Sequence, residues 1–394
     1  MSIKLIFNIN YRRVFFNILN KKNIILIFAI LIFIQGYSAF ITTINCVYDY
    51  SIIKTLINQF ITLNIGVMVY AYFKLNDSHN KILDYVIYAF ILQSLIQLIS
   101  FCIPGINDFL NNFRTNSAIE IGQWKYSGVR GLAVSGSNFY GLSSAYGLMY
   151  IIYFIRWNEL FKNNSLSKVL SICLLLFGSL SAGRTSIIGF IIGCIYFIVK
   201  KVILNRRKKE FSSKKVKLKN RNLIISICFS IFIIIGLVVI HENGINQNLE
   251  VKINNFKSFA FEMVYNFIEG DGLRTTSSNE MFTKMYFKVS EKTLFLGDGA
   301  YTNPDGTYYQ NTDVGYMRNI LFFGLLGFFL LFIYQLNFFK WNKKNLFKNI
   351  TILMYLIILH LKGDIIGFLI ITQSILMLFL IYELEFYRGD IING

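Results

Sequence analysis

Long apolar stretches alternate with short polar segments along the whole chain. An α-helix needs about 20 mostly apolar residues to cross the hydrocarbon core of a bilayer, so each stretch predicts a membrane-spanning helix. Ten spans are predicted, at residues 24–43, 54–73, 82–103, 132–155, 168–182, 185–203, 222–241, 319–339, 349–361 and 365–383. The spans at 168–182 and 349–361 are short, which is typical of tilted, broken or re-entrant helices.

This pattern predicts an all-α integral membrane protein with about ten transmembrane helices and one long external loop between spans 7 and 8. We divide the chain into residues 1–241 with spans 1 to 7, the external loop 242–318, and residues 319–394 with spans 8 to 10 and a short tail. Of the 394 residues, 55% are hydrophobic and only 15% are charged. Soluble domains carry about 25% charged residues, so soluble, fibrous and disordered classes are excluded.

Positive charge sets the predicted orientation. With both termini in the cytoplasm, 26 of the 39 Lys and Arg residues fall on the inner side, as the positive-inside bias requires. The net charge of +18 therefore reflects membrane topology, and we expect no nucleic-acid partner.

No cofactor or metal site is expected. The five cysteines are scattered without a Cys-x-x-Cys pair, and no second histidine or cysteine stands at ligand spacing from His360. The chain has no GxxxxGK[ST] loop for ATP and no pair of matching broken helices, which disfavours a transporter.

Four arginines are predicted at outer membrane edges, namely Arg130, Arg184, Arg274 and Arg318. Positive charge there opposes the positive-inside bias, and an arginine at membrane depth usually has an anionic partner. The planar guanidinium suits bidentate binding of phosphate, so several arginines meeting at one outer site would bind a diphosphate well. The alternative is that each arginine extends to lipid headgroups.

The run GVRGLAVSGSNFYGLSS around Arg130 is rich in glycine and small hydroxyl residues. Such a segment exposes backbone N–H groups and could bind an anion, although glycines also allow close packing of helices.

The external loop ends in a segment, LFLGDGAYTNPDGTYYQNTDVGYMRN, that mixes carboxylates with tyrosines. Aromatic rings stack on sugars and carboxylates bind sugar hydroxyls, so the candidate glycan-binding residues are Tyr301, Tyr308, Tyr309 and Tyr316, together with Asp313. An interfacial tyrosine belt and an Asp313–Arg318 ion pair are the alternatives.

The motif HLKGD places His360, Lys362 and Asp364 at the outer junction of the last two spans. A histidine oriented by a nearby aspartate can take a proton from a sugar hydroxyl, which makes this trio a candidate for general-base chemistry. A histidine with only an interfacial role remains the alternative.

The order of these features resembles the Wzy-type family of O-antigen and capsular polysaccharide polymerases, which is related in architecture to the O-antigen ligases. The resemblance covers most of the chain and rests on VRGL with Ser137 and Asn138, SAGRTS, LGDGA and DVGYMRN before GLLG, and the closing HLKGD. Where ligases have Pro-Asn after the first arginine motif, this chain has Gly136-Ser137-Asn138, which favours a polymerase.

The resemblance implies an inverting, metal-independent glycosyltransferase in the bacterial inner (cytoplasmic) membrane. It would join undecaprenyl-diphosphate-linked oligosaccharide units into O-antigen or capsule on the outer face, with a chain-length regulator protein as a candidate partner. The donor diphosphate would be held by Arg130, Arg184, Arg274 and Arg318. The catalytic candidates are His360, Asp313 and Asp364, and further substrate-binding candidates are Asn138, Tyr316 and Lys362. An O-antigen ligase and a flippase for lipid-linked oligosaccharides remain the alternatives.

The charge distribution generates a topology prediction. Reporter fusions after Lys215 and at Asn349 should read cytoplasmic, and fusions after Asn116 and Gln247 should read external. Alkaline phosphatase and green fluorescent protein fusions measure this, and an external signal at Lys215 would contradict the predicted orientation.

Overall fold

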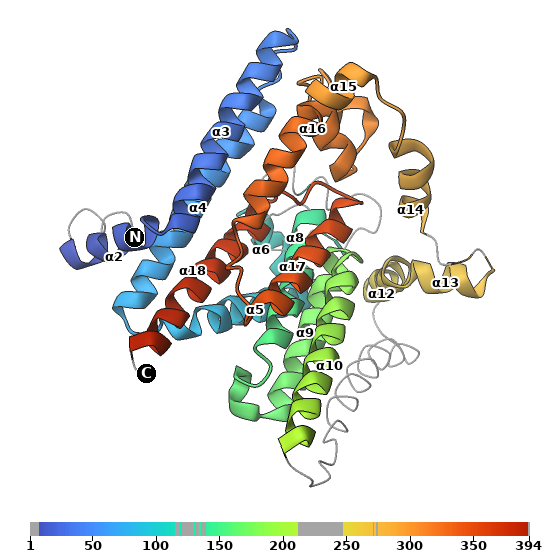
Figure 1. Cartoon of the computed structure of the whole chain (residues 1–394). Coiled ribbons are helices and arrows are strands. Elements are labelled where there is room, and N and C mark those ends of the chain that lie inside the picture. Colours follow the sequence, from blue (N-terminus) through green and yellow to red (C-terminus); the bar gives the residue numbers. More distant parts are fainter. Residues whose placement is uncertain are drawn as a thin grey trace. The chain divides into compact units, whose positions relative to one another are not determined.

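The computed structural model describes residues 8–114, 119, 129–130, 134, 139–211, 247–270, 272 and 275–392. Within these ranges every regular element is helical, and a single isolated β-bridge joins Thr302 to Tyr308. The chain divides into two compact units, whose helices are labelled in Figure 1. Unit 1 comprises Met1–Tyr85 and Thr276–Gly394, and unit 2 comprises Val86–Thr275.

Six described helices are long and apolar enough to cross a membrane. They are α3 (Lys22–Ile44), α4 (Ser51–Leu75), α5 (Ile82–Cys102) with the preceding turn η1 (His79–Lys81), α9 (Ser165–Ala182), α10 (Ser186–Phe211) and α16 (Gly315–Leu336). Two shorter apolar helices are α8 (Phe139–Ile155) and α17 (Leu346–His360). The predicted all-helical class is therefore confirmed, and these apolar helices are consistent with a membrane protein. The count of ten spans stays a prediction, because the predicted helix 222–241 lies outside the described residues.

The remaining described helices complete the two units. Unit 1 adds α2 (Ile9–Leu19), α14 (Thr276–Glu280), the π-helix η4 (Met281–Met285), α15 (Glu291–Leu296), η5 (Tyr309–Asn311) and α18 (Ile370–Ile392). Unit 2 adds α6 (Pro104–Asn111), η2 (Leu160–Asn163), α12 (Gln247–Ala260) and α13 (Glu262–Ile268). The segment predicted as a long loop thus contains several short helices, and its external position stays a prediction.

Several helix boundaries differ from the sequence prediction, and three helix starts bear on the site. α16 begins at Gly315, four residues before the predicted start, and the described part of the predicted span 132–155 is helical only from Phe139. α18 begins at Ile370 and not at 365. The residues before it form a turn, in which the backbone N–H groups of Ile365 and Ile366 donate to His360.

α16 is interrupted at Gly324, whose φ of 64° and ψ of −174° are outside the helical region. The interruption frees carbonyl groups in the preceding turn, and other segments of unit 1 pair with them. The N–H of Asp298 donates to Leu321 O at 2.6 Å, and the N–H of Gly299 donates to Phe322 O at 3.2 Å. Because an unpaired backbone group is costly in a membrane, these bonds allow a break within an apolar helix.

Two glycines permit this close approach. Gly297 and Gly324 both adopt positive φ with extended ψ, a region that is essentially restricted to glycine. A Cβ atom on Gly297 would overlap the backbone of Phe322, and a Cβ atom on Gly324 would overlap the backbone of Phe295. The segment after α15 therefore lies directly against the broken turn of α16 (Figure 1).

The far end of α18 is fixed by ion pairs to three other parts of unit 1. Glu383 pairs with Lys348 at the start of α17. Glu385 pairs with Lys21 before α3 and with Lys74 near the end of α4. All five side chains are mostly buried or half-buried, so each pair fixes the register of α18 against its neighbours.

In unit 2, α12 packs against the ends of two membrane helices. Phe256 and Phe259 share an apolar cluster with Phe101 at the end of α5 and Leu180 near the end of α9. The ammonium group of Lys252 donates to Phe101 O at 3.4 Å, where a cation is favourable at a helix C-terminus. This contact fixes α12 beside the turn that carries Arg184.

The glycine contacts generate a stability prediction. Substitution of Gly324 or Gly297 by alanine should lower the free energy of unfolding by about 1–3 kcal/mol, because each position combines positive φ with a backbone overlap. The matched control is Gly36→Ala in α3, where a Cβ atom meets nothing within 4 Å. Thermal unfolding of the purified protein in detergent measures the difference, and equal midpoints for Gly324→Ala and Gly36→Ala would contradict it.

Candidate functional site

A short hairpin, which we call the tyrosine hairpin (Tyr301–Tyr309), lies between α15 and α16. Its tip has the sequence NPDG, a combination typical of tight turns. The Asp305 carboxylate accepts hydrogen bonds from the N–H and the hydroxyl of Thr307. The bridge between Thr302 and Tyr308 brings the two arms together, so Tyr301 and Tyr308 lie close to each other.

Asp49, in the connection between α3 and α4, anchors the hairpin. Its carboxylate accepts from the backbone N–H groups of Tyr301 and Thr302, each at 2.7 Å. Burial opposes the charge on Asp49, but hydrogen bonds from Ser51 and the hairpin outweigh it, so the pKa of the carboxyl is lowered. Asp49 therefore stays ionised and holds the hairpin against the α3–α4 connection.

The tyrosine hairpin covers the guanidinium group of Arg318. The Arg318 Cζ atom lies 3.7 Å from the centroid of the Tyr301 ring and 3.9 Å from that of the Tyr308 ring. Arg318 is 8% exposed, whereas Tyr308 is 46% exposed. Stacking on two aromatic faces offsets part of the free energy needed to bury the cation.

Two donors of this buried guanidinium are available for a ligand. Nε and Nη2 of Arg318 have no hydrogen-bond partner among the residues that the structure describes. A buried charged donor without a partner is costly, and such groups usually belong to binding sites. The arrangement therefore offers a planar pair of donors to an anion such as a phosphate.

Asp364, in the turn between α17 and α18, lies on the other side of Tyr301. The Tyr301 hydroxyl donates to Asp364 Oδ2 at 2.7 Å, while Oδ1 has no hydrogen-bond partner in the described part of the chain. Burial raises the pKa of the Asp364 carboxyl to about 6, although Arg318 and the Tyr301 hydroxyl oppose the rise. Burial and the Asp364 charge raise the pKa of Tyr301 well above its ordinary value, so Tyr301 remains a donor.

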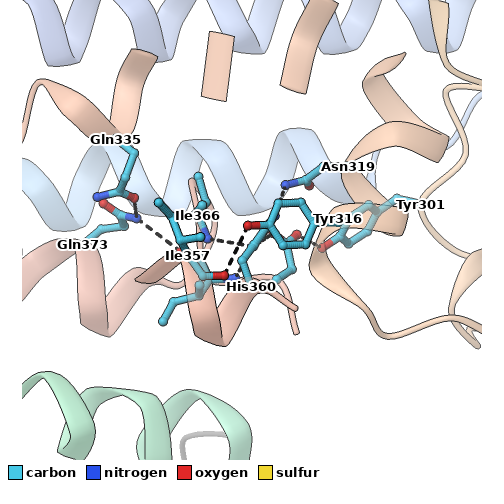
Figure 2. A network of polar contacts seen from close by, with 10 residues as sticks. Tyr301, Tyr316, Asn319, Gln335, Ile357, His360, Ile366 and Gln373 are labelled. Carbon is cyan, nitrogen blue, oxygen red and sulfur yellow. Dashed lines mark hydrogen bonds and ion pairs between the residues drawn. The ribbon is translucent and has the colours of Figure 1, made fainter. Parts of the chain in front are cut away.

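His360, the last residue of α17, is fully buried and both of its ring nitrogens have neighbours within hydrogen-bond distance. Nδ1 accepts from the backbone N–H groups of Ile365 at 3.2 Å and Ile366 at 3.3 Å. Nε2 lies 3.0 Å from the side-chain amide of Asn319 on α16. Figure 2 shows these contacts as part of one polar network that extends to Gln335 and Gln373.

The other predicted residues of unit 1 lie around the same group. The Tyr316 hydroxyl donates to Ile357 O at 3.2 Å, and its ring packs edge-on against His360. Asp313 immediately precedes the N-cap of α16 and is exposed. Desolvation by the surrounding protein raises the pKa of the Asp313 carboxyl. The positive charges of Lys362 and Arg318 only partly offset this rise. We call Tyr301, Tyr308, Arg318, His360 and Asp364 the Arg318 cluster.

In unit 2, two of the predicted arginines share one aromatic ring. The Cζ atoms of Arg130 and Arg184 lie 5.1 and 5.0 Å from the centroid of Phe259. Arg184 also forms an ion pair with Glu262 at the start of α13, while Arg130 stacks on Phe139 at 3.8 Å. Arg184 therefore already has an anionic partner from the protein.

A hydroxyl group fixes the turn that carries Arg184. Ser143 Oγ donates to Gly183 O at 2.6 Å and accepts from the N–H of Ser186 at 3.0 Å. Gly183 and Ser186 of the SAGRTS motif thus stabilise the α9–α10 turn through Ser143, independently of any role of Arg184.

The structure brings six of the ten predicted site residues into unit 1, namely Asp313, Tyr316, Arg318, His360, Lys362 and Asp364. Arg130 and Arg184 belong to unit 2, and Arg274 and Asn138 lie outside the described residues. Asp49 and Asn319 also belong to the group in unit 1, and neither is expected from the sequence. The position of Asn319 next to Arg318 is a sequence signal that could have identified it as a site residue. Nothing in the sequence near Asp49 indicates that it contacts the hairpin.

The Tyr301–Asp364 hydrogen bond generates a pH prediction. Tyr301→Phe removes a donor to the charged carboxylate, so the pKa of Asp364 should rise further above about 6. Infrared titration of the protonated carboxyl band, assigned with Asp364→Asn, measures this value. Tyr316→Phe is the control, because that hydroxyl donates to a backbone carbonyl. An unchanged midpoint in Tyr301→Phe would show that the hydrogen bond does not act on Asp364.

Comparisons with protein-family models, with curated proteins and with solved structures find no match to this chain. Any function assigned to the chain therefore depends on the chemistry of its own residues.

Proposed function

We propose that the chain is a polysaccharide polymerase of the bacterial cytoplasmic membrane. It would join undecaprenyl-diphosphate-linked oligosaccharide units on the outer face of that membrane, as an inverting glycosyltransferase that needs no metal. Two lines of argument support the proposal: the order of the sequence motifs, and the chemistry of the Arg318 cluster.

The observation that carries the proposal is the buried guanidinium of Arg318 with two donors that have no partner among the described residues. In glycosyl transfer from a lipid diphosphate, negative charge develops on the leaving diphosphate as the bond to the sugar breaks. Preorganised donors aimed at that charge lower the barrier most when they are shielded from water. Arg318 meets both conditions, because it is mostly buried and held by two rings.

The same cluster supplies groups for the other half of the reaction. The acceptor hydroxyl must lose a proton as its oxygen bonds to the anomeric carbon, and a carboxylate within hydrogen-bond reach is a suitable base. Asp364 has an oxygen without a partner beside the cation, and Asp313 is exposed at the start of α16. The outer edge of Tyr308 is accessible for stacking on a sugar.

The arginines of unit 2 are proposed as a second anion-binding element. Arg130 and Arg184 both lie near the Phe259 ring, so two guanidinium groups share one short stretch of α12. For a phosphate to bind Arg184, it would have to replace or join the carboxylate of Glu262. Arg184 is therefore a weaker candidate ligand than Arg318.

One structural observation favours a second candidate function. α16 is interrupted at Gly324, and interrupted helices mark substrate sites in many transporters. A flippase for lipid-linked oligosaccharides would use such a site. An O-antigen ligase would share the polymerase chemistry and differ only in its acceptor.

The glycan profile of a deletion strain separates the three functions. Single repeat units without a ladder support a polymerase, unattached long polymer supports a ligase, and repeat units that accumulate in the cytoplasm support a flippase. A normal ladder in the deletion strain would contradict all three.

The Arg318 assignment is tested by complementing that strain with variants. Arg318→Lys keeps the charge but loses the planar pair of donors, so polymerisation should fall sharply, and Arg318→Ala should be worse. A charge-assisted hydrogen bond contributes about 1.5–3 kcal/mol, which corresponds to roughly ten- to hundred-fold in rate. The exposed Lys288→Ala is the control. Membrane levels of each variant are measured by immunoblot, and a normal ladder from well-expressed Arg318→Ala would overturn the assignment.

A further inference from the structure

The turn between α17 and α18 is organised around one imidazole ring. His360 Nδ1 accepts hydrogen bonds from the backbone N–H groups of Ile365 and Ile366. The ring thus takes the place of the backbone carbonyl acceptors that these N–H groups would have inside a helix. Asp364 is the residue immediately before them. A Cβ atom on Gly315 would lie 2.5 Å from His360 Nδ1 and 2.6 Å from Gly363 O, so the start of α16 packs tightly against the turn.

These contacts define the protonation of His360. A nitrogen that accepts two backbone N–H groups uses its lone pair for them, so the proton of the neutral ring is on Nε2. Nε2 therefore carries the proton of the ring and lies 3.0 Å from the side-chain amide of Asn319. Neither nitrogen of His360 is left to take a proton from a substrate.

His360 and Asp364 do not form a hydrogen bond with each other. Asp364 Oδ1 lies 3.9 Å from His360 Nδ1, which is too long for a hydrogen bond, and the lone pair of that nitrogen faces the backbone. The groups that do face Asp364 are Arg318 from α16, Tyr301 from the tyrosine hairpin and Asn319. Its Oδ1 atom is the acceptor in this turn that has no partner among the described residues.

We infer that His360 is a positioning residue and that Asp364 is the group that accepts the proton from the acceptor sugar. This inference rests on the proposed polymerase function and reverses the roles expected from the sequence, in which the aspartate would orient the histidine. The acceptor hydroxyl gives its proton to Asp364 Oδ1 as its oxygen bonds to the anomeric carbon. The bond from that carbon to the phosphate oxygen breaks, and the diphosphate leaves with the electron pair beside Arg318.

The ionisation of Asp364 is consistent with this role. With a pKa of about 6, the carboxyl is ionised at neutral pH and yet more basic than an ordinary aspartate. The rate of transfer should therefore rise with pH through this range, because the carboxylate is the active form.

Two substitutions of His360 separate positioning from proton transfer. Asparagine places its Oδ1 at the same number of bonds from the backbone as Nδ1, so His360→Asn keeps an acceptor for Ile365 and Ile366. Glutamine places its amide at the position of Nε2 and leaves both N–H groups unpaired. If His360 positions Asp364, His360→Asn should keep most of the activity, and His360→Gln should lose roughly ten- to hundred-fold, as expected for a misplaced catalytic group.

The first measurement does not depend on polymerase activity. Infrared titration of the purified protein should show a carboxyl band with a midpoint near 6, absent from Asp364→Asn. The midpoint should be kept in His360→Asn and shifted in His360→Gln. A midpoint shifted equally in both variants, or unaffected by both, would overturn the positioning role.

The second measurement is the glycan ladder in the deletion strain and its dependence on pH. Asp364→Asn should abolish the ladder, and His360→Asn should retain it with the rise near pH 6. Loss of the ladder in both His360 variants, with normal expression and gel-filtration profiles, would make the imidazole itself essential and overturn the inference. A normal ladder in the deletion strain itself would instead reject the polymerase function, and the infrared result would still test the geometry.

Discussion

The exchange of backbone hydrogen bonds at the break in α16 is the interaction on which unit 1 depends. A helix within a bilayer can be interrupted only if other groups pair with its freed carbonyls. Here the N–H groups of Asp298 and Gly299 do so, and the Tyr37 hydroxyl donates to Phe323 O at 3.2 Å. The chain after α15 is thereby fixed to the middle of α16, so the tyrosine hairpin that follows has a defined place.

The fixed hairpin explains how a cation can be buried in this unit. Asp49 holds the hairpin from the α3–α4 connection, and the hairpin holds Arg318 through Tyr301 and Tyr308. Tyr301 also donates to Asp364, so one ring contacts the cation with its face and the anion with its hydroxyl. Arg318 and Asp364 are thus both in contact with Tyr301 and do not form a direct ion pair with each other. Such an arrangement sacrifices some stability, as functional sites commonly do, and leaves donors and an acceptor for a ligand.

The arginines of the two units differ in what surrounds them. Arg184 pairs with Glu262, and its turn is fixed by Ser143, so its environment is complete within the protein. Arg318 has aromatic faces in contact and two donors without partners among the described residues. The sequence presents both as arginines at predicted outer helix ends, and only the structure shows that one is paired with a carboxylate while the other has donors without partners among the described residues.

The sequence by itself determined the membrane class and the approximate positions of most helices. Apolar stretches of about 20 residues rarely form anything other than a membrane-spanning helix. It also indicated the DVGYMRN and HLKGD motifs, whose polar residues are unusual beside apolar spans. The tertiary structure decided what those motifs do. The break at Gly324 depends on backbone pairing with Gly299, the anchor at Asp49 lies more than two hundred residues from the hairpin, and His360 is tied to a turn that the hydropathy pattern assigns to a helix. Hydropathy reports only how apolar a segment is, whereas these contacts depend on which donor meets which acceptor, and that is fixed only when distant segments pack together.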